Sequence, residues 1–418
     1  DSREEQGQEV NKPVADILSA DRREGDAALC ALTERFDNLA VTPQTLAFTP
    51  DEVAQARAQV SQDLLDALDV AARRIEDFHR KQLPADIRYT DDVGMTLGMR
   101  WIPLDAAGLY VPGGKAAYPS SVLMNAIPAK VAGVQRLAMC VPIPSGVINP
   151  LVLAAADRAG ITEIYRVGGA QAVGAMAYGT QTIRPVDRIV GPGNAYVAEA
   201  KRQVFGHVGI DSIAGPSDVV VIADSGSDPR VIALDLLAQA EHDELAQSTL
   251  ITPDAAFADT VIEAVEKELG VLSRAAIAGA SWARNGAVLI TRDMREAVEL
   301  ANRLAPEHLE LMVDDPEALF AHVRHAGAAF LGRFCPEAVG DYVGGPNHVL
   351  PTSRTARFAS GLSVHDFMKR TTFLSGGPDA LRRIGPSAVA LAHAEGLEAH
   401  ALSVSARLDA LAAKTANA

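Results

Sequence analysis

Length, composition and charge set the first limits on this sequence. Its 418 residues allow two or three domains with real hydrophobic cores, at roughly 150 residues per domain. With 53 Asp and Glu against 38 Lys and Arg, the formal charge of −15 repels nucleic acid and anionic lipid, so no nucleic-acid partner is expected. Because no stretch approaches about 20 uncharged apolar residues, no membrane partner is expected either.

The cysteines and the start of the chain indicate a reducing compartment. Cys30, Cys140 and Cys335 are odd in number and far apart, which allows neither a disulfide framework nor a CxxC metal site. Residues 1–8 are polar and lack the apolar run of a secretory signal. We expect a cytoplasmic protein.

The first quarter of the chain predicts helices followed by a hairpin. A helical pattern covers roughly residues 10–37. Thr49-Pro50-Asp51-Glu52 is a helix start, and apolar residues at helical spacing then predict one amphipathic helix to about Lys81. From Ile87 to Val111 the pattern is strand-like around an Asp-Asp-Val-Gly turn, which predicts a hairpin.

After Val111, apolar strands alternate with helices in two series. The expected strands lie near residues 137–141, 163–167, 187–190, 218–223, 248–252, 287–291 and 309–313. Such alternation builds βαβ units, so we expect an α/β fold with two Rossmann-like parallel-sheet domains. The stretch from Pro378 onward predicts a small helical C-terminal tail region, in which Pro386 marks a boundary.

Two glycine-rich turns stand where a strand leads into a helix. Residues 167–172 (VGGAQA) and 190–195 (VGPGNA) would expose backbone N–H groups at a helix N-terminus, which favours phosphate. Neither completes GxGxxG, so each is also consistent with an ordinary turn. Residues 109–115 lack the spacing and the Ser or Thr of a P-loop, so ATP chemistry is not supported.

Pairs of imidazole and acid or amide are the main candidates for chemistry. Gln239 and His242 would stand roughly 60° apart on one helical face, as two metal ligands or as a helix end with a locally bonded His. Glu307 and His308 are adjacent in a short loop and could divide acid and base work, or merely cap a turn.

Three other segments carry candidate groups. Residues 340–348 (GDYVGGPNH) combine a carboxylate, an imidazole and glycines. Residues 395–400 (EGLEAH) repeat the pairing of acid and imidazole, with a solvated helix as the simpler interpretation. Cys335 could suggest thiol chemistry on an aldehyde, but nothing nearby in sequence lowers its pKa, so we expect a packed thiol.

In their order, these motifs resemble the histidinol dehydrogenase family over nearly the whole chain. The resemblance runs through residues 108–114 (GLYVPGG), 118–130 (YPSSVLMNAIPAK), 167–171 (VGGAQ), 191–194 (GPGN), 215–217 (GPS), 239–242 (QAEH), 306–308 (PEH), 347–352 (NHVLPT), 366–370 (DFMKR) and 395–400 (EGLEAH). It implies an aldehyde dehydrogenase-like arrangement of the two sheet domains. The domains expected are residues 1–109 with 219–361, an NAD-contacting domain at 110–218, and a dimerising tail at 362–418.

The resemblance also implies roles for single residues. One zinc ion per subunit would be bound by Gln239, His242, Asp341 and His400, and the catalytic pair would be Glu307 and His308. Substrate contacts would come from Ser217, Gln239, His242, His308, Asp341, His348, Glu395 and His400. NAD would be contacted by Tyr110, Gln171 and Asn194. Glu395 and His400 would complete the active site of the partner subunit in a homodimer.

The implied reaction is a four-electron oxidation of L-histidinol to L-histidine through a bound aldehyde, at the end of histidine biosynthesis. His308 would take the hydroxyl proton in the first hydride transfer to NAD, and Glu307 would activate water before the second. Three alternatives remain: a related enzyme that oxidises another polar alcohol, a zinc hydrolase without NAD, and a catalytically silent metal-binding dimer.

Overall fold

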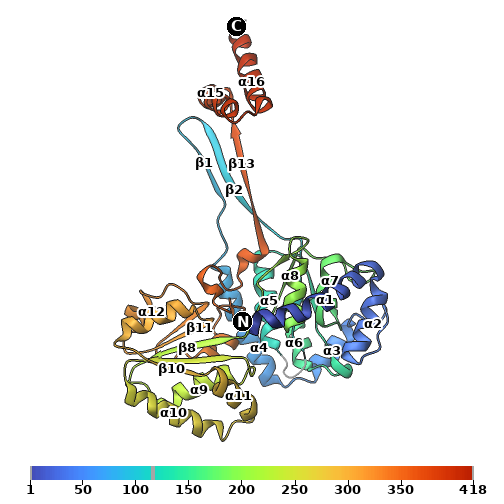
Figure 1. Cartoon of the computed structure of the whole chain (residues 1–418). Coiled ribbons are helices and arrows are strands. Elements are labelled where there is room, and N and C mark those ends of the chain that lie inside the picture. Colours follow the sequence, from blue (N-terminus) through green and yellow to red (C-terminus); the bar gives the residue numbers. More distant parts are fainter. Residues whose placement is uncertain (1, 114–117, 417–418) are drawn as a thin grey trace. The chain divides into compact units, whose positions relative to one another are not determined.

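The computed structural model describes residues 2–113 and 118–416 (Figure 1). The chain divides into two compact units, one made of the segment up to Gln82 with Leu104–Phe367, the other of Leu83–Pro103 with the segment from Met368 onward. Both parallel sheets lie in the first unit, and the domain boundaries expected from the sequence stay a prediction. No helix in the described ranges is long and apolar enough to cross a membrane.

The first sheet of the first unit is parallel, with the strand order β5-β4-β3-β6-β7. Its strands are β3 (Ala106–Tyr110), β4 (Arg136–Cys140), β5 (Glu163–Tyr165), β6 (Arg188–Val190) and β7 (Gly209–Ile210). Its helices are α5 (Pro119–Ala132), α6 (Pro150–Ala159), α7 (Gly169–Tyr178) and α8 (Ala195–Val204), preceded by α1 (Ser2–Glu24), α2 (Asp26–Asp37), α3 (Pro50–Ala58) and α4 (Gln62–Arg80).

The second sheet repeats this topology with the order β10-β9-β8-β11-β12. Its strands are β8 (Asp218–Ala223), β9 (Gln247–Thr252), β10 (Ala287–Ile290), β11 (His308–Met312) and β12 (Ala328–Leu331). Its helices are α9 (Pro229–Ala240), α10 (Ala255–Leu269), α11 (Ala275–Asn285), α12 (Met294–Leu304), α13 (Pro316–Phe320) and α14 (Glu337–Tyr342).

Both sheets have the strand order of a Rossmann fold, in which the third and second strands flank the first on one side and later strands on the other. Both faces of β8 are buried, because Val219 and Val221 pack with one apolar cluster while Val220 and Ile222 pack with another. The continuous apolar run at 219–223 follows from this burial. The two expected Rossmann-like sheets are confirmed.

The second unit is a three-stranded sheet with a helical hairpin. The predicted hairpin is confirmed as β1 (Ile87–Thr90) and β2 (Met95–Pro103), and β13 (Met368–Gly376) pairs antiparallel with β2. The hairpin does not extend to Val111 as expected, because the stretch after Pro103 contains β3, which pairs in the first parallel sheet. Helices α15 (Pro378–Ala394) and α16 (Glu398–Ala416) form the predicted helical C-terminus.

Three helix boundaries differ from the sequence-based expectation. The helical pattern at 10–37 breaks at Gly25, whose φ of +58° is left-handed and whose added Cβ would overlap the Gln181 side chain. The helix expected to run to Lys81 is interrupted between α3 and α4, where Ser61 is extended as an N-cap.

The third correction concerns Pro386, which lies inside α15 and marks no boundary. Gly385 beside it is buried, and the Leu408 side chain of α16 packs there at 3.2 Å from the position that a Cβ would take. The helix-to-helix packing therefore holds α15 together across the proline. The actual break lies at Gly396, with φ of +72°.

Candidate active site

A polar cluster lies where β8 and β11 begin, at the amino edge of the second sheet. Asp218 and His308 are the first residues of these adjacent strands, and His308 pairs in register with Val219. Glu307 immediately precedes β11 and is only 6% exposed. The short loop after α12 therefore places the expected catalytic pair inside the protein, so its side chains are not a solvated turn cap.

The surroundings of Glu307 give its carboxyl group a high proton affinity. Its Oε2 accepts a hydrogen bond from the backbone N–H of Asp218 at 3.3 Å, and the Ser217 hydroxyl donates a further bond. Burial and then the negative charge of Asp218 outweigh these bonds and raise its pKa from 4.5 to about 8. A carboxyl group with such a pKa can exchange protons near neutral pH.

His308 is a neutral imidazole between two carboxyl groups. Burial, together with the nearby His242 and His348, lowers its pKa to about 3. Its Nδ1 lies 3.6 Å from Glu337 Oε1, and its Nε2 lies 3.9 Å from Asp341 Oδ1. The ring is thus neutral with a lone pair free to act as a base, and the carboxylate forms of the two neighbouring acids offset the low proton affinity that burial imposes on it.

Glu337 was missed by sequence reasoning, and α14 explains its position. It is buried at the start of this helix, one turn before Asp341, so that both carboxyl groups face His308. Its pKa is raised by burial and by the neighbouring acids, first Asp341. A spacing of four residues between two acids was the signal in the sequence that could have identified it.

A second missed pair, Asp235 and Glu310, supports the start of α14. Glu310 is fully buried, and its Oε1 accepts a hydrogen bond from the backbone N–H of Glu337 at 2.7 Å. Burial raises the pKa of Glu310 to about 8 and that of Asp235 to about 6, and the two side chains are hydrogen-bonded to each other. Such a bond between two carboxyl groups requires that one of them keeps its proton.

His348 has a defined tautomer. Its Nδ1 lies 2.9 Å from the backbone carbonyl of Asp341, which can only accept, so this nitrogen carries the hydrogen. Its Nε2, 3.4 Å from the Ser121 hydroxyl, therefore has a lone pair available. Burial lowers the pKa of His348 to about 4.

Gln239 and His242 reach the same region from α9, with one correction. The helix ends at Ala240, so His242 lies in the turn beyond it and not on a helical face. The two side chains still meet, with Gln239 Nε2 3.4 Å from His242 Nδ1. Gln239 is fully buried, and its Oε1 has no hydrogen-bond partner in the described part of the chain.

Two groupings of these side chains could bind a metal. The unpartnered oxygen of Gln239 is what an oxygen ligand to a cation requires, in agreement with the expected ligand set. A different triad, His308, Glu337 and Asp341, has ligand atoms that all lie within 4.8 Å of one another. Asp341, whose pKa burial raises to about 7, belongs to both sets.

The remaining expected site residues, Glu395 and His400, belong to the second unit. Glu395 is the C-cap residue that follows α15, His400 lies in the first turn of α16, and both are exposed. The geometry within the first unit does not test their roles.

The expected cofactor residues gather at the carboxyl edge of the first sheet. Tyr110 ends β3 and is buried, with its hydroxyl accepting a hydrogen bond from the backbone N–H of Gly169 at 3.1 Å. Gln171 is buried in the first turn of α7. Asn194 caps α8, with Oδ1 accepting from the N–H groups of Tyr196 and Val197. These residues flank the point between β3 and β6 where the strand order reverses, which is where such sheets bind ligands.

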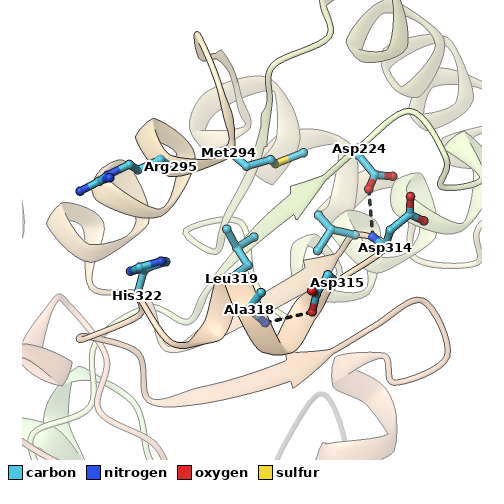
Figure 2. Close-up of a pocket in the computed structure, with 9 residues that line it drawn as sticks. Asp224, Met294, Arg295, Asp314, Asp315, Ala318, Leu319 and His322 are labelled. Atoms are coloured by element: carbon cyan, nitrogen blue, oxygen red, sulfur yellow. Dashed lines mark hydrogen bonds between the residues drawn. The ribbon is translucent and has the colours of Figure 1, made fainter.

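Figure 2 shows a pocket of about 390 Å³ at the opposite edge of the second sheet, near the ends of β8 and β11. Its carboxylates have structural roles, because Asp224 accepts from the N–H of Asp314 at 3.1 Å and Asp315 accepts from that of Ala318 at 3.0 Å. None of the residues expected to act in catalysis lines this pocket. The cluster at the start of β11 is therefore the better candidate.

A buried acid next to a neutral imidazole, in a chain with two Rossmann-ordered sheets, defines an α/β enzyme that works by proton transfer. Comparison with known proteins gives the family. The model of the family described as histidinol dehydrogenase matches residues 1–408, and the chain belongs to this family of oxidoreductases.

Individual relatives agree with this assignment. The chain is 68% identical to the histidinol dehydrogenase of Gluconobacter oxydans over 400 residues, covering 96% of this chain and 93% of the relative. It is 62% identical to that of Ruegeria pomeroyi, with 98% and 95% covered. The crystal structure of histidinol dehydrogenase from Elizabethkingia anophelis superimposes with a TM-score of 0.93 at 38% identity, over 96% of this chain and 92% of that chain.

Proposed function

We propose that this protein oxidises L-histidinol to L-histidine with NAD, through a bound aldehyde, as the last steps of histidine biosynthesis. The observation that carries the proposal is the buried pair Glu307 and His308, whose pKa values are shifted in opposite directions. Two successive oxidations at one carbon need one group that takes a proton from an alcohol and one that activates water. Glu307 and His308 supply both groups at the start of β11.

His308 serves as the base in both oxidations. As a neutral imidazole it accepts the hydroxyl proton of the alcohol while the hydride leaves the same carbon, which gives the aldehyde. In their ionised forms, Glu337, 3.6 Å from Nδ1, and Asp341, 3.9 Å from Nε2, favour the protonated ring during this transfer. In the second oxidation His308 takes a proton from the hydrated aldehyde.

Glu307 activates the water molecule that is consumed before the second oxidation. Its carboxylate form takes a proton from water while the water oxygen adds to the aldehyde carbon, and the protonated His308 returns its proton to the former carbonyl oxygen. This forms the hydrate and restores neutral His308 for the second oxidation. Because its pKa is about 8, the fraction in the carboxylate form rises between pH 6 and pH 8. Ser217 and the Asp218 backbone bind the carboxyl oxygens and hold them at this edge of the sheet.

Zinc is proposed as the resident metal, bound by Gln239, His242, Asp341 and His400. The unpartnered Gln239 oxygen supports this set, since a buried acceptor without a partner is unfavourable unless something binds it. When bound, the metal orients the imidazole and the amine of the substrate. Asp341, His348 and Glu395 are the further substrate contacts that we propose.

NAD is proposed as the hydride acceptor, at Tyr110, Gln171 and Asn194. The glycine turn leads directly into the N-terminus of α8, and the positive end of this helix dipole suits a pyrophosphate. Gln171 supports this placement, since its buried Nε2 has no hydrogen-bond partner among the described residues. The cofactor supplies an oxidant for each of the two steps.

A homodimer is proposed, with Glu395 and His400 contributed to the partner's active site. The second unit exposes large apolar side chains on its sheet and on both of its helices, among them Leu374 at 65%, Leu391 at 65% and Leu402 at 58% exposed. Such a concentration of exposed apolar groups is typical of an interface. A second copy of the chain would cover these side chains and bring the two polar residues to a site.

Product analysis tests the proposed function. Purified protein with zinc, NAD and L-histidinol is expected to yield histidine with two NADH per histidinol. Absence of NADH would contradict the proposal and leave a hydrolase or a silent metal-binding protein. Turnover of other polar alcohols without histidinol turnover would identify a related enzyme with a different substrate.

A further inference from the structure

Behind the Gly191 turn, residues 191–194, the chain has buried a Lys and an Asp that the proposed chemistry does not use. The turn leaves β6 at Gly191, whose φ is +112°, and enters α8 at the cap Asn194. A Cβ on Gly191 would overlap the backbone carbonyl oxygen of Tyr110, at the end of the neighbouring β3. The turn is therefore pressed against the strand that carries one of the proposed NAD contacts.

Both polar groups of the Gly191 backbone are bound by charged side chains. The N–H of Gly191 donates to Asp211 Oδ2 at 2.8 Å, and Lys201 Nζ donates to the Gly191 carbonyl at 3.0 Å. Lys201 Nζ and Asp211 Oδ1 also form an ion pair. The three residues thus form a closed loop of polar contacts, which fixes the peptide on each side of Gly191.

This ion pair is almost completely removed from solvent. The side chain of Lys201 is 2% exposed and that of Asp211 is 5% exposed. Removing two charges from water costs about as much as their attraction returns, so the pair adds little to stability compared with apolar residues of the same size. The pair instead fixes the orientation of the Gly191 backbone, because charged side chains bind both its N–H group and its carbonyl oxygen.

The second glycine turn is linked to the same strand end. The Tyr110 hydroxyl accepts the N–H of Gly169, while the Tyr110 backbone packs on Gly191. The orientation of Gly191 therefore determines how the two turns and the cap Asn194 stand relative to each other. A displaced Gly191 peptide would shift the turn and the N-terminal end of α8, whose dipole favours the phosphates of a dinucleotide at this edge.

We propose that Lys201 and Asp211 are positioning residues for the dinucleotide, acting through the Gly191 turn and without touching the cofactor. The inference rests on the proposed use of NAD at this edge. It assigns to the pair an effect on NAD affinity that is separate from its effect on folding. It predicts no effect on the binding of the alcohol.

The test uses the neutral double variant Lys201→Met with Asp211→Asn, in the full chain with zinc. Each single variant leaves a buried charge without its partner and lowers stability strongly, whereas the double variant leaves none. Asn retains an oxygen for the Gly191 N–H, but the carbonyl of Gly191 loses its donor. The measurements are the urea midpoint, KM for NAD, KM for histidinol, kcat, and hydrogen exchange of residues 188–197.

The double variant is expected to lose much less stability than either single variant, because it leaves no buried charge without a partner. Its KM for NAD should rise at least about tenfold, because the Gly191 turn is no longer held in the binding-competent position, with KM for histidinol unchanged. Exchange in residues 188–197 should accelerate. A wild-type KM for NAD together with unchanged exchange would overturn the proposal.

Asp26→Asn is the matched control. Asp26 is also 5% exposed, and its carboxylate accepts from the backbone N–H of Thr182 at 3.2 Å and from its hydroxyl at 2.6 Å. It should lower stability without changing KM for NAD, and an equal rise in that KM would refute the specific role of the pair. If the wild-type protein reduces no NAD, the proposed function fails, whereas the exchange measurement still decides whether the pair fixes the turn.

Discussion

Replacing Glu307 by Gln is expected to stabilise the protein at neutral and alkaline pH. In the folded chain the pKa of Glu307 is about 8, against 4.5 for an ordinary glutamate. At pH 7 Glu307 is therefore mostly protonated in the folded chain and ionised in the unfolded chain, so unfolding releases a proton. The free energy of unfolding is consequently lower at pH 7 than at acid pH. A raised folded-state pKa gives stability that is complete below pH 4.5 and is lost as the pH rises to about 8.

The size of this effect follows from the shift. Each pKa unit corresponds to about 1.4 kcal/mol, so the wild-type protein should lose ~3 kcal/mol of unfolding free energy from this group between pH 5 and pH 8. Gln does not titrate, and its amide oxygen can still accept the Asp218 N–H. The stability difference between Glu307→Gln and wild type should therefore grow by ~3 kcal/mol in favour of the variant across this range.

Urea unfolding of chelator-treated protein at pH 5 and pH 8 measures this difference. Glu296→Gln is a suitable control, because Arg292 lowers the pKa of this partly exposed carboxylate. Its contribution to stability is present above the ordinary pKa of a glutamate and is lost only toward acid pH, so the control should show no gain at pH 8. A stability difference for Glu307→Gln that does not change with pH would refute the burial argument.

Three further predictions follow from the structure. His308→Ala should abolish alcohol oxidation while zinc, measured by atomic emission, stays bound; loss of zinc would instead favour the triad of His308, Glu337 and Asp341 as the ligand set. Gly191→Ala should lower the unfolding free energy in urea by at least about 2 kcal/mol, because of its positive φ and the Tyr110 carbonyl, and an unchanged midpoint would contradict the tight turn. Leu391→Glu should convert the proposed dimer to a monomer in light scattering, whereas Val271→Glu, 76% exposed in the first unit, should not; a dimeric Leu391 variant would argue against the proposed interface.

The sheets were predictable from the sequence, since buried parallel strands appear as continuous apolar runs such as residues 219–223. The helix boundaries were less so. Position 25 requires a glycine because a Cβ there would overlap the Gln181 side chain. The helix α15 continues through Pro386 because it packs against α16. Contacts between segments distant in sequence decide these positions, and local propensity carries no record of them.

The candidate site divides in the same way. Glu307 and His308 could be found because they are adjacent, and Gln239 and His242 because they are close in the chain. Glu337 and Glu310 escaped, although local spacing held a trace of each: Glu337 stands four residues before Asp341 on a helix, and Glu310 stands two residues after His308 on a strand. Only the packing of α14 near β11 shows why both acids matter.

The division of labour between Glu307 and His308 is the central claim, and the half-reactions of Glu307→Gln test it most directly. Supplied separately with L-histidinol and with L-histidinaldehyde, the variant should retain NADH formation from the alcohol at close to the wild-type rate and lose most of it from the aldehyde. An equal loss in both half-reactions would contradict the account, because it would mean that Glu307 does not act specifically on water.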